Sequence, residues 1–448
     1  MNKTYEIITY GCQMNENDSE KLSGIIKSMG YTRTDNLEKA SLIIINTCSI
    51  RENADVKFFG FLGSLKHYKK DNPEQVLAVC GCMMQQERII EKIIKTYHQV
   101  DIIFGTHNIH RFSNLLSEFL MNRKQLIDIW EDNNKIVEGL PVDHKHTFKS
   151  YVTIMNGCNN FCTFCIVPHT RGREVSRHPQ NIISEVRKLG KTPCVEVTLL
   201  GQNVNSYGKD LKENYSFANL LVDLNQVDGI ERIRFMTSHP KDMSDDVIEA
   251  IANCDKVCPS IHLAIQSGST KLLKKMNRRY SKENILSLVS KIRERIPGVS
   301  ITTDLIVGFP GETEADFQDT LDVVEACNFD SAFSFIYSIR EGTPAAKMKD
   351  QIDDEIKHQR MDRLLDLIRK LSKGQNVKFL NQTVDVLVES QIKNENYRLM
   401  GRTPSGKIVN LNGEDDIIGK IVPVHIDDIQ SFSLKGTQVL DERRNIWG

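Results

Sequence analysis

The chain has 448 residues, of which 40% are hydrophobic and 26% are charged, and its formal net charge is −1. This length predicts two or three domains, and the composition is typical of a globular protein. The near-zero charge excludes a uniformly basic nucleic-acid-binding surface, so any RNA contact must come from local patches.

We expect a cytoplasmic protein that binds no membrane, because no apolar run approaches the roughly eighteen residues of a membrane span. Residues 1–10 also lack the long apolar stretch of a signal peptide. Disulfides rarely persist in the cytoplasm, so the eleven cysteines should be reduced thiols or metal ligands.

Residues 1–125 alternate apolar runs with helix-like stretches. Predicted strands cover Glu6–Tyr10, Leu42–Asn46, Val76–Cys80 and Val100–Phe104, and predicted helices cover Asp18–Met29, Ala54–Tyr68, Gln85–Tyr97 and Ile109–Met121. Alternation of this kind predicts an α/β domain with an open parallel sheet wrapped by helices.

Three cysteines follow the first three of these strands: Cys12, Cys48 and Cys82. The carboxyl ends of parallel strands share one edge of a sheet, where neighbouring strands are only ~4.8 Å apart, so these thiols can converge. We interpret them as a three-cysteine iron-sulfur site with one open iron. Cys80 competes with Cys82, but Cys80 lies within the strand and Cys82 in the turn after Gly81. The alternative is three unrelated buried thiols, because free Cys packs like a small hydrophobic residue.

Residues 126–148 are polar and form a predicted linker, in which His144 and His146 are weak candidates for metal ligands. From residue 149 to residue 376 the alternation resumes. Predicted strands cover Val152–Met155, Val195–Leu200, Arg232–Met236, Ile261–Ile265, Ser300–Ile306 and Ser331–Tyr337, and the clearest helices are Asn181–Leu189, Asn284–Ile296 and Glu314–Cys327. Six such units predict a partial (β/α)6 barrel, whose chemistry belongs at the carboxyl ends of the strands.

The loop after the first barrel strand, GCNNFCTFC, carries Cys158, Cys162 and Cys165 at a C-x3-C-x2-C spacing. Short spacers let the three thiolates converge, and sulfur ligands favour iron-sulfur clusters, zinc or cuprous copper. A closed zinc site or a purely electron-carrying cluster normally needs four protein ligands, whereas three leave one iron of a [4Fe-4S] cluster open. The alternative is a zinc site completed by His169 or Cys194.

Further candidate binding residues stand near the ends of the later barrel strands. They are mostly small or amide residues suited to hydrogen bonding with a nucleoside and an amino acid: Gly201, Gln202, Asn203, Ser238, His239, Gln266, Ser267, Gly268, Asp304, Gly308, Gly311 and Glu312. Each alone is equally typical of a turn, and only their expected common edge favours a binding role. The remaining cysteines of this domain are predicted to be packing thiols: Cys194, Cys254, Cys258 and Cys327.

Two groups of basic residues are candidates for phosphate contacts. The first follows the QSGS turn and comprises Lys271, Lys274, Lys275, Arg278 and Arg279; the second follows the cysteine loop and comprises Arg171, Arg173 and Arg177. A solvated helix face is the alternative for the first group.

A long charged helix is predicted from Glu355 to Asn376, and the chain changes character after it. Residues 377–441 contain five short predicted strands, at Thr383–Glu389, Tyr397–Arg402, Lys407–Asn410, Ile421–Ile426 and Phe432–Gln438, and residues 442–448 form a tail. The pattern predicts a small β-barrel, an architecture that often binds oligonucleotides. Residues 381–448 hold eight Lys and Arg against ten Asp and Glu, so this module cannot be a uniformly basic clamp.

Along nearly its whole length the chain resembles the radical S-adenosylmethionine (SAM) methylthiotransferases, and it is most similar to their tRNA-modifying MiaB type. The resemblance rests on YGCQMNENDSE at Tyr10–Glu20, NTCSIRENA at Asn46–Ala54, GCNNFCTFCIVPHTRGREVSR at Gly157–Arg177, LLGQNVNSYG at Leu199–Gly208, RFMTSHP at Arg234–Pro240, IVGFPGETEADF at Ile306–Phe317 and FSFIYSIREGTPAA at Phe333–Ala346. It implies an amino-terminal cluster domain, a central radical SAM barrel and a carboxyl-terminal TRAM-like module.

The resemblance also implies two [4Fe-4S] clusters. Cys158, Cys162 and Cys165 would bind the cluster whose open iron chelates SAM, with Phe164 packing near the SAM adenine, and Cys12, Cys48 and Cys82 would bind an auxiliary cluster. The strand-end residues expected to contact SAM are Gly201, Gln202, Ser238, Gln266 and Asp304. Many radical SAM enzymes carry a Gly-Gly-Glu turn at the first of these positions, and its acid is absent here.

The implied reaction converts N6-dimethylallyladenosine at position 37, beside the anticodon of tRNA, to its 2-methylthio derivative, with one SAM as methyl donor and one as radical source. Implied partners are a tRNA anticodon stem-loop carrying that base and a low-potential electron donor such as flavodoxin or ferredoxin, and a monomer is expected. Alternatives within the family are threonylcarbamoyladenosine in tRNA or an aspartate of a ribosomal protein. A different class would be a non-catalytic iron-sulfur protein that carries electrons or binds RNA, and the missing fourth cysteine at both sites argues against it.

Overall fold

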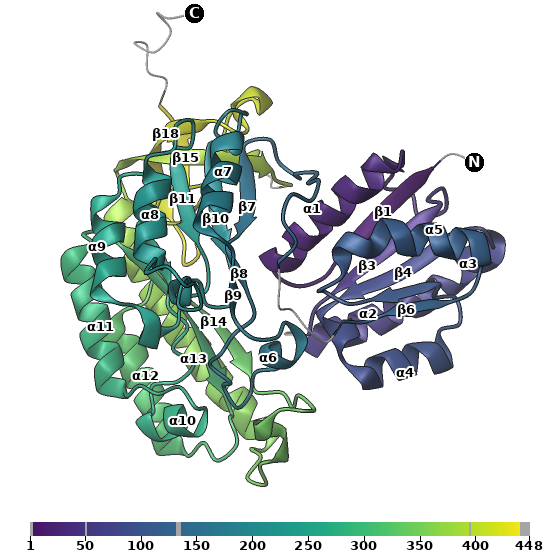
Figure 1. Ribbon diagram of the computed structural model, residues 1–448. Coiled ribbons are helices and arrows are strands. Elements are labelled where there is room, and N and C mark those ends of the chain that lie inside the picture. Colours follow the sequence, from purple (N-terminus) through teal and green to yellow (C-terminus); the bar gives the residue numbers. More distant parts are fainter. Residues whose placement is uncertain (1–2, 50–51, 131–135, 394–395, 440–448) are drawn as a thin grey trace, which may run out of the picture.

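The computed structural model describes residues 3–49, 52–130, 136–393 and 396–439. Figure 1 shows an amino-terminal domain, in purple and blue, beside a central barrel in teal and green. A second, smaller barrel in yellow, built from the carboxyl-terminal strands, packs against the central one. The predicted tail, residues 442–448, lies outside the described residues.

The amino-terminal domain is a parallel sheet with the strand order β2-β1-β3-β4-β5-β6. Its strands are β1 (Thr4–Thr9), β2 (Thr32–Arg33), β3 (Leu42–Thr47), β4 (Val76–Gly81), β5 (Ile102–Phe104) and β6 (Leu126–Asp128), and its helices are α1 (Gln13–Ser28), α2 (Glu52–Ser64), α3 (Lys66–Asp71), α4 (Glu87–Thr96) and α5 (Phe112–Asn122). The four predicted strands are confirmed within two residues at each end. The edge strands β2 and β6 are too short to show a hydrophobic period, and β6 extends the sheet past residue 125.

Helix α1 begins at Gln13, earlier than the predicted start at Asp18. Its first turns carry polar residues that suggest solvent exposure in the sequence, yet Asn15, Asn17 and Asp18 are buried. The reason is that this end of the helix lies against the central barrel, where Asn17 Nδ2 donates to Tyr151 O at 3.3 Å. A polar stretch therefore forms part of a domain interface.

The central barrel contains six parallel strands in two three-stranded sheets, ordered β11-β10-β7 and β12-β13-β14. They are β7 (Lys149–Thr153), β10 (Glu196–Leu200), β11 (Arg232–Phe235), β12 (Ser260–His262), β13 (Ser300–Val307) and β14 (Ser331–Ile336). Isolated parallel bridges, such as Ser238 to Leu263, join the two sheets. The predicted partial (β/α)6 barrel is confirmed.

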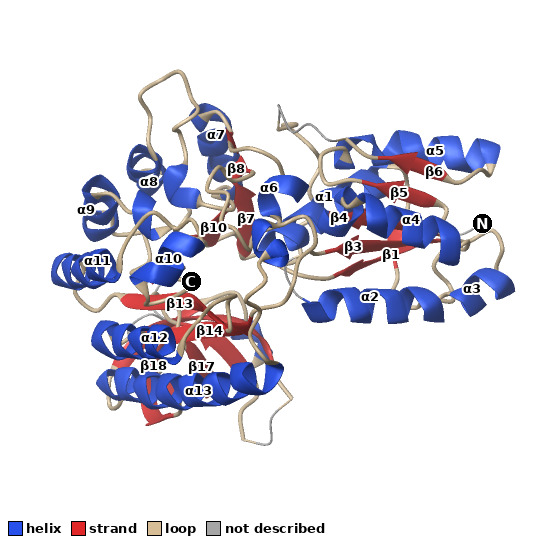
Figure 2. Ribbon diagram, turned by 90° about the horizontal axis from the view of Figure 1, so that it is seen from below, coloured by secondary structure: helices blue, strands red, loops and turns tan. Residues whose placement is uncertain are grey.

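Helices enclose the strands from outside, as Figure 2 shows. They are α7 (Pro179–Leu189), α8 (Phe217–Asn225), α9 (Asp245–Asn253), α10 (Thr270–Lys275), α11 (Lys282–Arg295), α12 (Glu314–Cys327) and α13 (Asp354–Asn376). The core between strands and helices contains Cys194, Cys254 and Cys327, so these thiols pack as predicted. Cys258 is also buried.

The carboxyl-terminal strands close into a barrel with the order β15-β16-β17-β19-β18, which confirms the predicted small β-barrel. They are β15 (Thr383–Gln391), β16 (Leu399–Arg402), β17 (Ile408–Asn412), β18 (Ile421–Ile429) and β19 (Ser433–Gln438). This barrel docks at the amino ends of the central strands, where Arg232, the first residue of β11, donates through Nη1 to Arg402 O at 2.9 Å and through Nη2 to Asp385 O at 3.1 Å. The opposite, carboxyl ends are thus left for chemistry.

Among the described residues, the helices are all too short or too polar to cross a membrane.

Candidate functional site

The three cysteines of the amino-terminal domain lie together beyond the ends of β1, β3 and β4. Asn15 Oδ1 is 4.0 Å from Cys12 Sγ and 3.9 Å from Cys82 Sγ. A Cβ at Gly11 would lie 2.7 Å from Cys48 Sγ, so Cys48 packs directly against the loop that carries Cys12. Residues far apart in sequence therefore converge around Asn15.

Cys82, and not Cys80, faces Asn15. Cys80 is fully buried in the core between the sheet and helices α1 and α5. The chain then turns at Gly81, which has a φ of +97° and where a Cβ would lie 2.2 Å from Thr47 O. Only glycine fits that turn, because a side chain would be strained and would clash with backbone. The turn carries Cys82 out of the strand and toward Asn15.

The thiols of this group differ in acidity. The interaction with the Cys48 thiol lowers the pKa of Cys12 to about 6. Burial raises the pKa of Cys82, and the charge of Arg171 opposes that rise. Metals bind the thiolate form and release the thiol proton, so Cys12 would give up its proton to a metal more readily than Cys82.

The second cysteine group lies in the loop between the short paired strands β8 (Met155–Asn156) and β9 (Val175–Ser176). Asn160 Nδ2 lies 3.5 Å from Cys158 Sγ, and Arg278 Nη1 lies 3.3 Å from Cys162 Sγ. The backbone N–H of Cys165 donates to Cys162 O at 2.9 Å, which folds the end of the loop back on itself. Hydrogen-bond donors thus face two of the three sulfurs.

Burial raises the pKa of Cys158 to about 11 and that of Cys165 to about 12. These thiols remain protonated at neutral pH until a cation compensates their charge. A metal cluster would supply that charge and displace the protons.

Neither group has the geometry of a single-ion site. Among the residues that the structure describes, no three or more His, Cys, Asp or Glu side chains lie close enough together to hold one metal ion. A zinc ion requires all its sulfur ligands at about 2.3 Å. Thiolates of an iron-sulfur cluster each bind a different iron and stand farther apart, and three sulfur donors are a set that such a cluster accepts.

Cys194, one of the two alternative zinc ligands, lies elsewhere, and so does His144 of the linker. Cys194 Sγ donates to Glu196 O at 3.4 Å inside the barrel core. His144 Nδ1 faces Glu20 Oε2 at 3.6 Å and lies 3.4 Å from Ser150 Oγ. Neither side chain therefore completes a cysteine site.

The carboxyl ends of the barrel strands present buried polar atoms that have no hydrogen-bond partner in the described part of the protein. They are Asn156 Oδ1, Gln202 Oε1, Ser238 Oγ, His239 Nε2 and Tyr337 Oη. Leaving a buried polar atom unpaired costs about 1–3 kcal/mol, and native proteins rarely tolerate several in one region. These atoms are suited to a polar ligand such as SAM, which carries a nucleoside and an amino acid.

Two residues at the carboxyl ends of the barrel strands, which form the mouth of the barrel, have a strained backbone. Thr237 has a φ of +67° and Gln266 a φ of +69°. Positive φ is unfavourable for residues with a Cβ, especially for a branched residue such as Thr, and such strain clusters at functional sites.

The other predicted SAM-contacting residues lie at different distances from the carboxyl ends of the barrel strands. Phe164 packs against the cluster of Ile306, Phe309 and Tyr337 at the mouth. At Gly201 a Cβ would lie 2.6 Å from Met155 Cγ, so the backbone needs glycine for this close approach. Asp304 lies within β13 instead of at its end, with Oδ2 3.2 Å from His262 Nε2.

Glu312, which was expected at the mouth, has one carboxylate oxygen, Oε1, that is buried without a hydrogen-bond partner in the described part of the protein. Its carboxylate is buried and accepts from Arg360 Nη1, on α13, at 2.8 Å. This ion pair holds helix α13 to the loop after β13.

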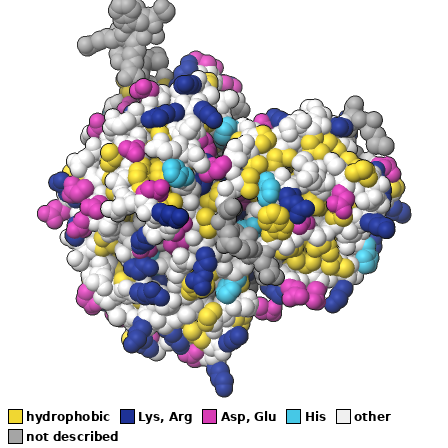
Figure 3. Space-filling model, viewed as in Figure 1, with side chains coloured by type: hydrophobic (Ala, Val, Ile, Leu, Met, Phe, Trp, Pro, Cys, Tyr) yellow, Lys and Arg dark blue, Asp and Glu magenta, His cyan; other side chains and the backbone are white. Residues whose placement is uncertain are grey.

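The predicted phosphate-binding role is also wrong for three of the arginines, because Arg171, Arg177 and Arg278 are at most 8% exposed. In the first group Lys271 pairs with Asp316 at 2.8 Å, and Lys275 pairs with Asp350. The side chains of Lys274 and Arg279 are exposed. Figure 3 shows basic and acidic side chains interspersed over the visible face, as the net charge suggests.

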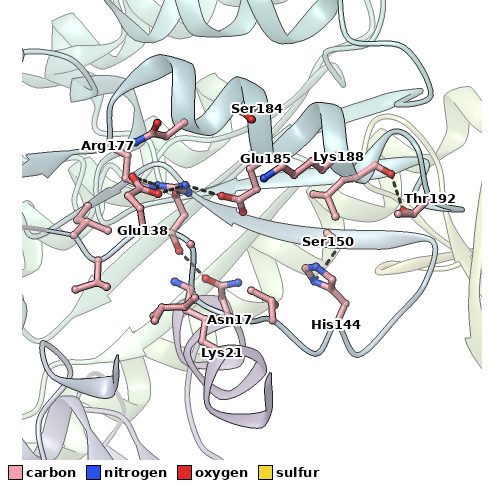
Figure 4. Close-up of a pocket in the computed structure, with 18 of the residues that line it drawn as sticks. Asn17, Lys21, Glu138, His144, Ser150, Arg177, Ser184, Glu185, Lys188 and Thr192 are labelled. Atoms are coloured by element: carbon pink, nitrogen blue, oxygen red, sulfur yellow. Dashed lines mark hydrogen bonds and ion pairs between the residues drawn. The ribbon is translucent and has the colours of Figure 1, made fainter. Parts of the chain in front are cut away.

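Arg177 instead borders a cavity of about 740 Å³ between α1, the linker, β7 and α7 (Figure 4). Its Nη2 donates to Glu138 Oε2 at 2.5 Å and to Glu185 Oε2 at 2.6 Å. Cysteines are absent from the described lining of this cavity, so it is separate from both thiol groups. The pair with Glu138 ties the linker to the barrel.

Asn15 and Asp18 were not predicted as site residues, and Arg171 was predicted only as a phosphate contact. Arg171 Nη2 donates to Asn15 Oδ1 at 2.9 Å and to Asp18 Oδ2 at 2.8 Å, and its Nε lies 3.2 Å from Cys82 Sγ. The sequence pattern that could have identified Asn15 and Asp18 is their spacing from Cys12, since residues three apart share one face of a helix.

Family models match three parts of the chain: the uncharacterized protein family UPF0004 at residues 4–105, the radical SAM superfamily at residues 152–324 and the TRAM domain at residues 377–439. A protein of Alkaliphilus oremlandii named tRNA-2-methylthio-N(6)-dimethylallyladenosine synthase is 55% identical over 98% of this chain and 93% of its own length. Proteins of the same name from Clostridium botulinum and Clostridium tetani are each 54% identical over 97% of this chain and 96% of their own length.

Solved structures share the fold at low sequence identity. The radical SAM methyltransferase TsrM of Kitasatospora setae superimposes with a TM-score of 0.57 at 13% identity, over 77% of this chain and 75% of its own. The cobalamin-dependent SAM radical enzyme OxsB gives a TM-score of 0.52 at 11% identity, over 82% of this chain and 56% of its own.

Proposed function

The chain belongs to the family of tRNA-2-methylthio-N6-dimethylallyladenosine synthases, and on that premise we propose how its residues perform the reaction. It is a radical SAM methylthiotransferase that converts N6-dimethylallyladenosine at position 37 of tRNA to the 2-methylthio derivative. The radical SAM domain implies a [4Fe-4S] cluster and SAM. Cys158, Cys162 and Cys165 would hold that cluster.

Cys12, Cys48 and Cys82 would hold a second, auxiliary [4Fe-4S] cluster. The observation that carries this proposal is the convergence of these three thiols around Asn15, at the face of the amino-terminal domain that meets the barrel. When bound, the clusters and two SAM molecules supply a carbon-centred radical, a methyl group and a sulfur atom for C2 of the adenine.

The barrel residues would bind and orient the substrates. The unpaired atoms of Gln202, Ser238 and His239 face a region suited to the polar parts of SAM. Phe164, beside the cysteine loop, provides an apolar surface for the adenine of SAM. Gln202 has no carboxylate, so the SAM amino group would be held by neutral acceptors.

The tRNA must present its base at this mouth. An adenine stacked in an anticodon loop has to be turned out at a cost of a few kcal/mol, which contacts elsewhere on the RNA must offset. Lys274 and Arg279 are exposed beside the mouth and are available for phosphates. The carboxyl-terminal barrel, which matches the TRAM domain, offers a second RNA-binding surface.

The remaining partners are proposals of the same kind. Radical formation from SAM needs one electron, so a low-potential donor such as flavodoxin or ferredoxin is required. One chain carries both cysteine groups, so a monomer suffices. Eleven free thiols suit the reducing cytoplasm.

An anaerobic assay of the cluster-replete enzyme tests the proposal. Three anticodon stem-loops are compared, carrying dimethylallyladenosine, threonylcarbamoyladenosine or unmodified adenosine, and the nucleosides are read by mass spectrometry. We expect the methylthio product from the dimethylallyl stem-loop alone. Equal turnover of the unmodified stem-loop, or turnover of the threonylcarbamoyl one only, would refute the substrate assignment.

A further inference from the structure

Arg171 belongs to the central barrel but its guanidinium lies in the cysteine site of the amino-terminal domain. It follows helix α6 (Val167–Thr170), only a few residues after the cysteine loop. Figure 1 shows α6 between the two domains. On the other side of that interface, Thr106 Oγ1 donates to Thr170 O at 3.3 Å, which fixes the end of α6 against the amino-terminal sheet.

Arg171 contacts both the thiol of Cys82 and the carboxylate of Asp18. Nε lies 3.2 Å from Cys82 Sγ, while Nη2 donates to Asp18 Oδ2 at 2.8 Å and to Asn15 Oδ1 at 2.9 Å. The side chain is 6% exposed. Because a buried guanidinium is costly unless its donors are paired, the position is built for these partners and not for solvent or phosphate.

We propose that Arg171 is a positioning residue for the auxiliary cluster, and that its hydrogen bond to Cys82 sulfur raises the reduction potential of that cluster. This inference rests on the proposed function, in which Cys82 is a cluster ligand. A donor on a ligating sulfur withdraws electron density from the metal, and a nearby positive charge stabilises the more negative, reduced form. Both effects favour reduction.

A second arginine makes the same kind of bond at the other cysteine group and provides a matched control. Arg278 is 4% exposed, and its Nη1 lies 3.3 Å from Cys162 Sγ. Its remaining donors are used by Tyr280 Oη at 2.7 Å and by Ala264 O. The two arginines should therefore act separately, each on its own cluster.

The test uses a full-length background protein that lacks the radical SAM cysteines (Cys158→Ala, Cys162→Ala and Cys165→Ala) and is reconstituted anaerobically with iron and sulfide. Its one remaining cluster is titrated with reductant and followed by electron paramagnetic resonance. We expect Arg171→Gln to shift the midpoint potential to a more negative value, and Arg171→Lys, which keeps the charge, to shift it less. Arg278→Gln in the same background should leave the potential unchanged.

The outcomes separate this inference from the proposed function. An unchanged potential in Arg171→Gln overturns the inference alone. If that variant holds no iron, Arg171→Lys decides, and an unchanged potential there also overturns it. Loss of iron from both variants, with an unchanged far-ultraviolet circular dichroism spectrum, would limit Arg171 to holding the cysteines in place and refute the tuning role. A background protein that binds no cluster would refute the auxiliary cluster itself, and the inference with it.

Discussion

Thr153 Oγ1, at the end of the first barrel strand, donates a buried hydrogen bond of 2.8 Å to Asn17 Oδ1 on helix α1 of the amino-terminal domain. The Asn17 amide also donates to Tyr151 O at 3.3 Å. One side chain thus satisfies a donor and an acceptor of the neighbouring domain. Because α1 starts directly after Cys12, this contact ties the helix next to the first cysteine to the barrel.

Replacing Asn17 with alanine should loosen that interface. The change leaves the Tyr151 carbonyl and the Thr153 hydroxyl without their partner, at a cost of about 1–3 kcal/mol. Hydrogen exchange should become faster in both α1 and β7. Asn253→Ala is a suitable control, because the side-chain bonds of Asn253 to the described residues stay within its own helix, to Glu249 O and Oε2. Faster exchange in α1 alone would contradict a role in joining the domains.

The two cysteine groups should have separable roles. Cys82→Ala should lose the methylthio product but keep SAM cleavage to 5′-deoxyadenosine under strong reductant, whereas Cys162→Ala should lose both. Cys80→Ala should lose neither activity, since Cys80 is a buried core thiol next to the site. Loss of cleavage in Cys82→Ala, with the other cluster intact by spectroscopy, would refute this division.

Stability should fall in mild acid partly because of His239. Burial lowers the pKa of His239 to about 2, and the charges of Arg278, Lys241 and Lys209 contribute. In the unfolded chain a histidine titrates near 6.5, so below that pH the unfolded state binds a proton that the folded state does not. The folded state therefore loses up to about 1.4 kcal/mol per pH unit from this group as the pH falls below about 6.5.

A matched variant isolates that contribution. His239→Gln should lose about 2 kcal/mol less stability than the parent between pH 6.5 and pH 5. Urea unfolding at the two pH values measures the difference, and other titrating groups cancel in the comparison. An equal loss in parent and variant would show that His239 is protonated in the folded protein.

Docking of the carboxyl-terminal barrel should depend on Arg234. Its Nε pairs with the buried Glu196 Oε2 at 2.8 Å, in addition to the bonds to Thr403 O and Pro404 O. Arg234→Met should destabilise the protein by about 3–5 kcal/mol, because it leaves Glu196 charged and unpaired. Adding Glu196→Gln should recover part of that loss in denaturant unfolding. If the second change makes the protein less stable still, the pair is not the source of the cost.

Much of this arrangement could be predicted from the sequence because it depends on short-range patterns. The strands that carry Cys12, Cys48 and Cys82 are runs of apolar residues, and the topology of a parallel sheet brings their ends together. The choice of Cys82 over Cys80 followed from the turn at Gly81, which the structure shows to need glycine.

What could not be predicted depends on contacts between domains. Asn15 and Asp18 show no sequence pattern that marks them as buried, Arg171 was expected to contact phosphate, and the packing of α1 against the barrel buries all three. For the same reason Arg278 looked like a phosphate ligand, whereas its guanidinium faces Cys162. Charge alone does not tell a buried arginine from an exposed one.

The central claim is that each group of three cysteines holds its own [4Fe-4S] cluster. Iron and acid-labile sulfide should be counted after anaerobic reconstitution in the parent and in two triple variants, one with Cys12, Cys48 and Cys82 changed to alanine and one with Cys158, Cys162 and Cys165 changed. The account predicts about eight irons per parent chain and about four in each variant. About four in the parent, with none left once the barrel cysteines are removed, would contradict it.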